Sequence, residues 1–280
     1  MTGIRLTRRA ALLLYTAVTV LAFVWLVPVI STLMISVIPI ATTRSGWWRT
    51  GLADLTFANY VRAWEQGLSS YVVNSFVITI GSVALSVVIG SAAAYAFSRL
   101  RFRFKETAYF LLITTMIVPV QIILIPLLPW FRTLHLTGDL SQYLGINLVH
   151  VAFGAGWAVF MLGGFMAEIP EEILEAARMD GASHAGIFRS VVLPLAVPGI
   201  ASFALIDFVF VWNDLLLGLT LLDRDHQPLT VGLANLQAPH LAQENLVSAG
   251  SIMAILPPLL LFALLNRFYV RGLFAGGVKG

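Results

Sequence analysis

Six long stretches of the chain carry almost no charged side chains, and they constrain the fold more than any other feature. They are residues 10–43, 66–98, 107–131, 140–167, 190–222 and 245–266, and only the fifth contains acidic residues, Asp207 and Asp214. A helix needs about 20 mostly apolar residues to cross the hydrocarbon core of a membrane. The pattern therefore predicts an all-α integral membrane protein with six transmembrane helices. We expect one transmembrane domain over 1–280, with spans at 10–38, 71–98, 107–131, 146–167, 191–222 and 247–267.

Composition excludes a soluble enzyme. Hydrophobic residues make up 59% of the chain and charged residues 11%, whereas soluble domains carry about 25% charged residues. Too few charges are present to cover a water-facing surface, so lipid must contact most of it. A formal net charge of +3 is too small to indicate binding of nucleic acid.

The positions of the basic residues predict the orientation in the membrane. Twelve of the 17 Lys and Arg residues lie in the N-terminal segment, in 99–105, in 168–189 and after 266. Because cytoplasmic loops carry the excess of Lys and Arg, these four segments should be cytoplasmic. Both termini then face the cytoplasm of a multi-pass protein.

The segment 168–190 between the fourth and fifth spans has the pattern of two short helices joined by a glycine. Pro170 is suited to the start of a helix whose first turn is acidic. Gly181 should end this helix in a left-handed conformation, and Ser183 should cap the next one. An amphipathic helix resting on the lipid surface is the simpler interpretation, but the acidic side is poorly suited to an anionic leaflet.

This segment resembles the EAA loop of ABC-importer permeases. The matching residues are Glu175-Ala-Ala177, Gly181, Ile187 and Leu193-Pro194. The resemblance extends along the chain to the smaller, MalG-like permeases of the maltose-transporter type, through Phe57-Ala-Asn-Tyr60, Asn74-Ser75, Ala93-Ala-Tyr-Ala-Phe-Ser-Arg-Leu-Arg-Phe102, Pro119-Val-Gln-Ile-Ile-Leu-Ile-Pro126, Val211-Trp-Asn-Asp214, Gly232-Leu-Ala-Asn-Leu236 and the tail from Gly272.

The resemblance implies a subunit that does not itself hydrolyse ATP. Its partners would be two copies of an ATP-binding ABC subunit that holds ATP and Mg²⁺, a second, MalF-like permease, and an extracytoplasmic solute-binding protein, all at a bacterial cytoplasmic (inner) membrane. It further implies that a cytoplasmic helix–Gly–helix coupling loop and the C-terminal tail contact the ATPase. The residues implied are Glu175, Ala176, Ala177, Asp180, Gly181, Ile187, Leu193 and Pro194 in the loop, and Gly276, Gly277, Val278, Lys279 and Gly280 in the tail.

Polar residues within the spans are candidates for the substrate pathway, although such residues more often bond neighbouring helices. They are Gln121, Asn147, His150, Asp207 and Asn213. An ion-coupled secondary transporter is the alternative function, since it would need a carboxylate deep in the membrane. An intramembrane enzyme is a third class. The sequence has no cysteine, no phosphate-binding G-x-x-x-x-G-K-[ST] loop and no His spacing typical of a metal site.

Overall fold

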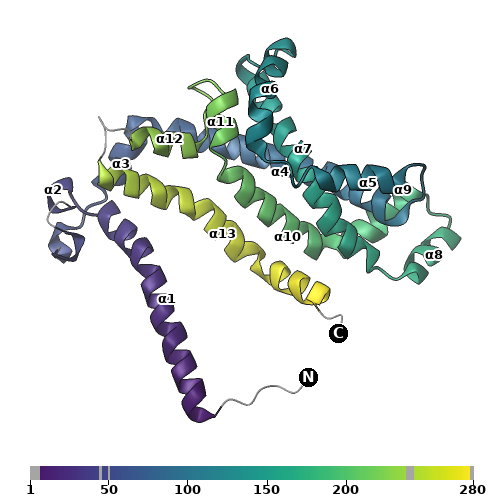
Figure 1. Cartoon of the computed structure of the whole chain (residues 1–280), viewed down its shortest axis with the longest axis horizontal. Coiled ribbons are helices and arrows are strands. Elements are labelled where there is room, and N and C mark those ends of the chain that lie inside the picture. The colour runs from purple at the N-terminus through teal and green to yellow at the C-terminus, as the bar shows by residue number, and fades with distance from the viewer. Residues whose placement is uncertain (1–6, 44–45, 50, 238–242, 278–280) are drawn as a thin grey trace. The chain divides into compact units, whose positions relative to one another are not determined.

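The computed structural model describes residues 7–43, 46–49, 51–237 and 243–277, without the side chains of 52 and 267–277. All regular secondary structure in these ranges is helical, which confirms the all-α prediction (Figure 1). The chain divides into two compact units, one formed by Met1–Leu68 with Leu233–Met253 and the other by Ser69–Gly232 with Ala254–Gly280.

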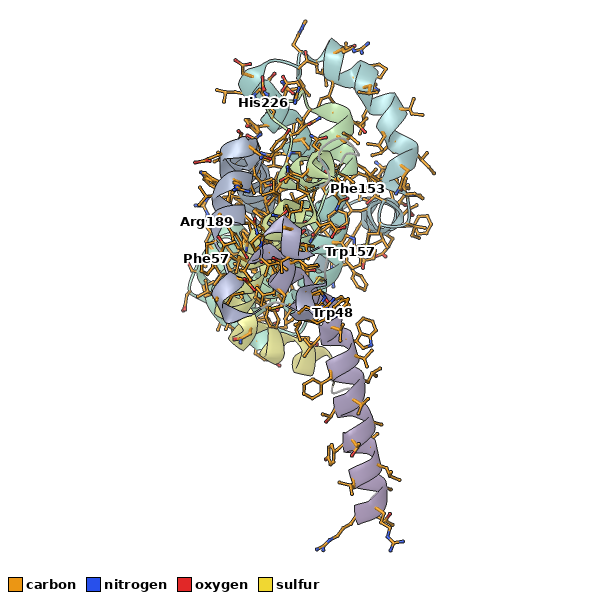
Figure 2. The ribbon with its side chains drawn as sticks, turned by 90° about the vertical axis from the view of Figure 1, so that its left-hand side faces the viewer. Trp48, Phe57, Phe153, Trp157, Arg189 and His226 are labelled. Atoms are coloured by element: carbon orange, nitrogen blue, oxygen red, sulfur yellow. The ribbon has the colours of Figure 1, made fainter. Side chains whose placement is uncertain are left out.

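The first unit is dominated by an isolated apolar helix. Its elements are α1 (Arg8–Ser36), α2 (Ile40–Thr43), η1 (Trp47–Arg49), η2 (Leu52–Asp54), α3 (Ala58–Ala63), η3 (Trp64–Leu68) and the parts of α12 and α13 that fall in it. Large apolar side chains project from α1 in all directions (Figure 2), and none of its most apolar window is buried. Such a surface needs lipid or another apolar partner. At the end of α1, the buried amide of Asn59 donates to the carbonyls of Ser36 (2.9 Å) and Ile38 (2.8 Å).

The second unit is a helical bundle. Its elements are α4 (Ser69–Arg99), α5 (Lys105–Thr114), α6 (Val120–Thr133), α7 (Asp139–Ala167), α8 (Glu171–Met179), α9 (His184–Ile187), η4 (Phe188–Val192), α10 (Leu193–Trp212), α11 (Leu216–Leu221), the first turn of α12 (Leu229–Leu236), and the later part of α13 (Glu244–Gly277).

Helices α4 and α7 form the most extensive pair in this unit. A stripe of small residues on α4, including Ser82, Ser86 and Gly90, is buried. A methyl group at Gly90 would lie 2.3 Å from the Ala158 Cβ atom, so the helices meet there at backbone distance. Ser82 donates to Asn147 Oδ1 at 3.0 Å. Small residues and interhelical hydrogen bonds of this kind are how helices associate in lipid.

Five helical stretches in the described ranges are long and apolar enough to cross a membrane: Arg8–Ser36, Ala58–Arg99, Asp139–Ala167, His184–Trp212 and Glu244–Asn266. The predicted span 107–131 differs, because α5 and α6 are separated by the irregular segment 115–119. Pro119 has no N–H group and favours an extended residue before it, which interrupts the helix. The predicted span 191–222 also breaks, at Asn213, and continues as the short α11.

Candidate functional site

The predicted helix–glycine–helix segment begins with α8. Pro170 is its extended N-cap, and the acidic residues Glu171 and Glu172 follow in the first turn, where the helix dipole favours negative charge. Leu174 is 1% exposed and faces the bundle. Ile173, the residue before it, is 41% exposed.

Gly181 ends α8 with a φ of 81°, as its position predicts. Its N–H donates to the carbonyl of Arg178, and the N–H of Ala182 donates to that of Ala177, each at 3.0 Å. These two bonds form a Schellman motif, in which the residue after the C-cap, here Gly181, adopts the left-handed conformation. A Cβ at Gly181 would meet nothing within 4 Å, so the left-handed backbone, and not a lack of space, is what favours glycine here.

Ser183 caps the second helix by accepting a hydrogen bond from the Gly186 N–H at 3.2 Å. This helix is not the short separate one that the sequence pattern indicated. It runs through α9, η4 and α10 as one helical stretch, His184–Trp212. Leu193 and Pro194 therefore lie inside a continuous helix, whose π-helical turn (Phe188–Val192) leads into α10.

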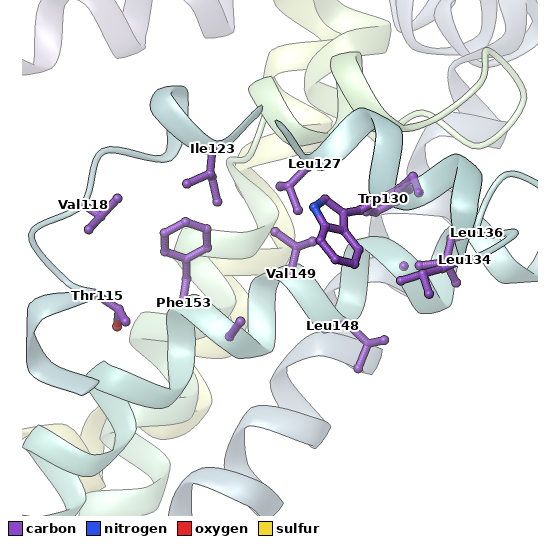
Figure 3. A pocket seen from close by; sticks show the side chains of 13 residues that line it. Thr115, Val118, Ile123, Leu127, Trp130, Leu134, Leu136, Leu148, Val149 and Phe153 are labelled. Carbon is purple, nitrogen blue, oxygen red and sulfur yellow. The ribbon is translucent and has the colours of Figure 1, made fainter. Parts of the chain in front are cut away.

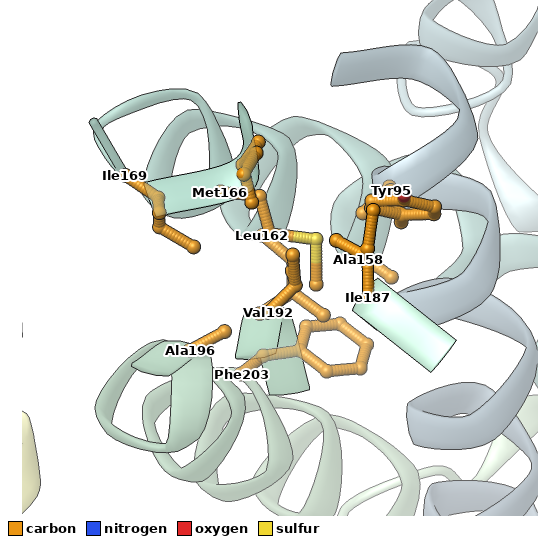
Figure 4. Packing of buried hydrophobic residues seen from close by; sticks show 11 residues of the cluster. Tyr95, Ala158, Leu162, Met166, Ile169, Ile187, Val192, Ala196 and Phe203 are labelled. Carbon is orange, nitrogen blue, oxygen red and sulfur yellow. The ribbon is translucent and has the colours of Figure 1, made fainter. Parts of the chain in front are cut away.

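An apolar cluster fastens this segment to the bundle. It combines buried side chains from α4, α7, α8 and the long second helix, and is shown in Figure 4: Ala94, Tyr95, Ala158, Leu162, Met166, Ile169, Leu174, Ile187, Val192, Ala196 and Phe203. Leu174 and Ile187 are each 1% exposed. Full burial of one such side chain contributes about 1.5–3 kcal/mol. Ile187, predicted as a coupling residue, is buried in this cluster and packs the loop against the bundle.

Arg99 adds a polar clamp that sequence reasoning missed. Its guanidinium donates to the carbonyls of Met166 and Ile169, at the end of α7 and just after it, and to Glu171 Oε2 at 3.0 Å. Glu171 also accepts from Arg178 at 2.8 Å. The side chain of Arg99 is only 11% exposed. Sequence reasoning assigned this residue only to the cytoplasmic charge excess, because its acceptors are backbone carbonyls far along the chain.

The side of α8 that faces away from the bundle is open. Glu175, Ala176 and Asp180 are exposed, and Met179 is 87% exposed. Within the part of the chain that the structure describes, no ion pair or hydrogen bond involves the Glu175 carboxylate. A groove of about 880 Å³ runs beside this face, lined by Ser98, Arg99, Leu100, Arg101, Lys105, Glu171, Glu175, Arg178 and His184.

The predicted C-terminal tail lies mostly outside the described residues. Gly276 and Gly277 are the last residues of α13, while Val278, Lys279 and Gly280 are outside the description.

The five predicted pathway residues occupy different environments. Asn147 bonds Ser82, and Asn213 donates to the carbonyl of Val209 in its own helix at 2.8 Å. Gln121 is exposed in the first turn of α6. Asn147 therefore joins α4 to α7, and Asn213 bonds the last turn of α10.

His150 and Asp207 are the two buried candidates without satisfied partners. His150 is 2% exposed, and its Nε2 atom lies 3.9 Å from Asp214 Oδ2. Asp214 itself accepts from the N–H groups of Leu217 (3.2 Å) and Gly218 (3.0 Å), so it caps α11. Among the described residues, neither ring nitrogen of His150 nor the Oδ2 atom of Asp207 has a hydrogen-bond partner.

Two adjoining cavities lie along α7. The apolar one, of about 390 Å³, is shown in Figure 3, and its lining includes Leu127, Trp130, Leu134 and Leu148. The other, of about 330 Å³, contains Asp207 and is lined by Met116, Val118, Val120, Phe153, Gly154, Trp157, Phe203, Ile206, Asp207 and Phe210. Val118 and Phe153 contribute to both.

A polar network closes the end of the bundle where α7 begins. Asp223 accepts from Gln142 Nε2 at 2.6 Å and lies 2.5 Å from His226 Nδ1. Asn74 donates to two carbonyls of the same loop and accepts from Tyr143 at 2.6 Å. Partial burial raises the pKa of Asp223, but hydrogen bonds from Gln142 and His226 and the charge of His226 outweigh it, so the pKa lies below its ordinary value.

The matches to known proteins together cover nearly the whole chain. The profile of the family described as "Binding-protein-dependent transport system inner membrane component" matches residues 86–273. The osmoprotective compounds uptake permease GgtD of Synechocystis sp. is 33% identical, over 95% of this chain and 91% of that protein. The melibiose/raffinose/stachyose import permease MelC of Bacillus subtilis is 35% identical, over 81% and 83%. The trehalose transport system permease SugB of Mycobacterium tuberculosis is 32% identical, over 91% and 93%.

The fold is also similar to that of a solved structure. A chain of a bacterial ABC transporter for import of the acidic polysaccharide alginate superposes with a TM-score of 0.79. The sequences are 22% identical, and the match covers 95% of this chain and 99% of that one.

Proposed function

Because the chain belongs to the family of inner-membrane components of binding-protein-dependent transport systems, we propose that it is the permease subunit of an importer for a sugar or oligosaccharide. The similarity to MelC and SugB, whose names give melibiose, raffinose, stachyose and trehalose as cargo, is the observation that carries the choice of substrate class. Transport would proceed by alternating access, driven by two copies of a separate ATPase. A second permease subunit and an extracytoplasmic solute-binding protein would complete the importer.

Uptake into proteoliposomes tests this function against ion-coupled transport. The complex purified with its partners is reconstituted, and uptake of the sugar that raises the melting temperature of the cognate binding protein is measured. Uptake should require ATP and the binding protein and should persist when an ionophore removes ion gradients. Uptake without ATP, abolished by the ionophore, would favour the ion-coupled alternative.

We propose six membrane crossings with both termini in the cytoplasm, the third crossing being made by α5 and α6 together. A helix interrupted at membrane depth is tolerated where the irregular backbone is covered by protein or lines a cavity, and Met116 and Val118 line the cavity beside Asp207. The chain has no cysteine, so single cysteines report the sides of the membrane. Ser45→Cys should react with an impermeant maleimide from outside, and Arg103→Cys only after permeabilisation. The opposite labelling would refute the orientation.

We further propose that α8 and its Gly181 cap contact the ATPase through the open face that includes Glu175, Ala176 and Asp180. An exposed carboxylate without an internal partner is suited to pairing with a basic residue of another subunit. Loss of one member of a buried interfacial charge pair costs about 2–5 kcal/mol. The last residues of the tail, after Gly277, would add a second contact.

Charge reversal on α8 tests the contact. Glu175→Arg should insert normally but copurify poorly with the ATPase and lose uptake. The matched control is Glu168→Arg, an exposed residue at the end of α7 and outside α8, which changes the net charge equally and should retain both. Equal ATPase recovery and uptake for the two variants would remove Glu175 from the interface.

A further inference from the structure

We propose that the cavity beside Asp207 is a sugar-binding subsite within this subunit, which takes one pyranose ring of the transported sugar. The proposal rests on the proposed function and adds to it the place where the cargo is held inside the membrane. It is carried by three features of the same cavity: a buried carboxylate, aromatic walls and an interrupted helix.

The first feature is the carboxylate. Asp207 is 5% exposed, and its Oδ2 atom has no partner among the described residues. Ionisable groups within membrane spans are rare and mark functional sites by default. Asp207 faces Gly154, near the middle of α7. A methyl group at Gly154 would lie 3.1 Å from Asp207 Oδ1 and 2.8 Å from Ser86 Oγ, so the glycine keeps space open at the carboxylate.

The second feature is the set of aromatic side chains around it. Phe153 and Trp157 lie one turn apart on α7 (Figure 2), and Phe203 and Phe210 lie on α10. Trp157 is 46% exposed and Phe210 is 56% exposed, so their surfaces are available to a ligand. Small-molecule sites are mainly apolar and aromatic, with a few polar groups that fix orientation, and occupy about 300–1,000 Å³. The cavity, at about 330 Å³, falls at the small end of this range.

The third feature is the break between α5 and α6. Met116 and Val118, in the irregular segment 115–119, form part of the cavity wall. Non-helical backbone at membrane depth is stable only when protein covers it or when it faces water. Discontinuous helices form the substrate sites of many transporters for this reason.

These features match the chemistry of a sugar ring. The apolar C–H face of a pyranose packs against an aromatic side chain, here Trp157. A hydroxyl group at the ring edge can donate to a carboxylate, here Asp207. The neighbouring cavity in Figure 3 has aromatic and aliphatic walls but no acidic or basic side chain. It offers no carboxylate to accept from such a hydroxyl group, and it provides an internal control.

Protection of a single cysteine tests the subsite directly in the complete transporter. Trehalose, melibiose and raffinose are first tested for ATP-driven uptake by the wild-type complex, and a transported one becomes the probe. In the cysteine-free chain, Ile206→Cys places a thiol in the Asp207 cavity and Leu148→Cys places one in the apolar cavity. Maleimide labelling of this subunit is then followed with increasing sugar. Met116→Cys, which lines the Asp207 cavity and not the apolar one, replaces Ile206→Cys if that variant does not assemble.

Sugar at ten times its dissociation constant should slow labelling of Ile206→Cys about tenfold and leave Leu148→Cys unchanged. Adding Asp207→Asn should raise the sugar concentration for half-protection about tenfold or more, since a hydrogen bond to a charged group is lost. Trp157→Leu should act in the same direction, whereas Trp130→Leu, in the apolar cavity, should not. The subsite is refuted if a transported sugar protects neither thiol or protects both equally. If the wild type takes up none of the three sugars and no sugar that raises the melting temperature of the cognate binding protein, the proposed sugar function fails, and the subsite fails with it.

Discussion

Replacement of Arg99 should release α8 from the bundle. The guanidinium joins the end of α4, where it originates, to the carbonyls of Met166 and Ile169 and to the first turn of α8. Arg99→Gln removes the planar fork that reaches these acceptors together. Arg99→Lys keeps the charge but not the fork, so its effect should be intermediate.

The structure sets the size of the effect. A hydrogen bond from a charged donor contributes about 1.5–3 kcal/mol. Because two backbone carbonyls lose such a donor, the free energy that holds α8 to the bundle should fall by about 3 kcal/mol, taking the lower value for each bond. The ion pair with Glu171 adds at most about 1 kcal/mol, because that carboxylate is 48% exposed and retains Arg178. Since about 1.4 kcal/mol corresponds to a factor of ten, α8 should open about a hundred times more often.

Amide hydrogen exchange of the purified complex measures this opening. Peptides from 171–182 should exchange about a hundredfold faster in Arg99→Gln than in the wild type, because exchange of protected amides follows local opening. Arg101→Gln removes the same charge from an exposed neighbour and should leave the rate unchanged. Wild-type exchange in Arg99→Gln would refute the clamp, and equal acceleration in both variants would assign the effect to net charge.

Three further predictions concern other parts of the second unit. Gly181→Val should weaken copurification of the ATPase through about 1–3 kcal/mol of backbone strain, whereas Gly181→Asn, which tolerates the left-handed conformation, should retain it. Gly90→Ala should lower the melting temperature in detergent, because its new methyl group would lie 2.3 Å from the Ala158 Cβ atom and overpacking costs about 1–3 kcal/mol. The control is Gly163→Ala, whose methyl group would meet nothing within 4 Å and should leave the melting temperature unchanged. The lowered pKa of Asp223 means that its ionised form stabilises the fold at neutral pH. The stability advantage of the wild type over Asp223→Asn should therefore shrink as the pH falls below about 4, and a pH-independent difference would contradict the ionic role.

The sequence predicted the helical class and the helix–glycine–helix segment because both follow from local rules. Charge-free apolar stretches form helices in lipid, and the left-handed φ of Gly181 follows from its place after an acidic-to-basic helix. The break at Pro119 was not predicted. Pro28, Pro126 and Pro198 remain inside helices, so a proline alone does not show where a span is interrupted.

The environments of the polar residues could not be predicted for a different reason. Asn147 and Asp207 were both pathway candidates in the sequence, since each is a polar residue in an apolar span. The fold separates them: Ser82 on α4 satisfies Asn147, while Asp207 lies beside a glycine and retains an unpartnered oxygen. Which polar residue is satisfied depends on the helix opposite it, and that pairing joins residues distant in the chain.

The helical stretch His184–Trp212 connects the proposed ATPase contact to the proposed sugar subsite. Near its start, Ile187 packs in the same apolar cluster as Leu174 of α8. Farther along, Phe203 belongs to this cluster and also lines the cavity that contains Asp207. Packed interiors transmit displacement because they have few voids. A movement of α8 therefore has a continuous packed path to the cavity through Phe203, and a single rigid element can change both the ATPase-facing surface and the shape of the subsite.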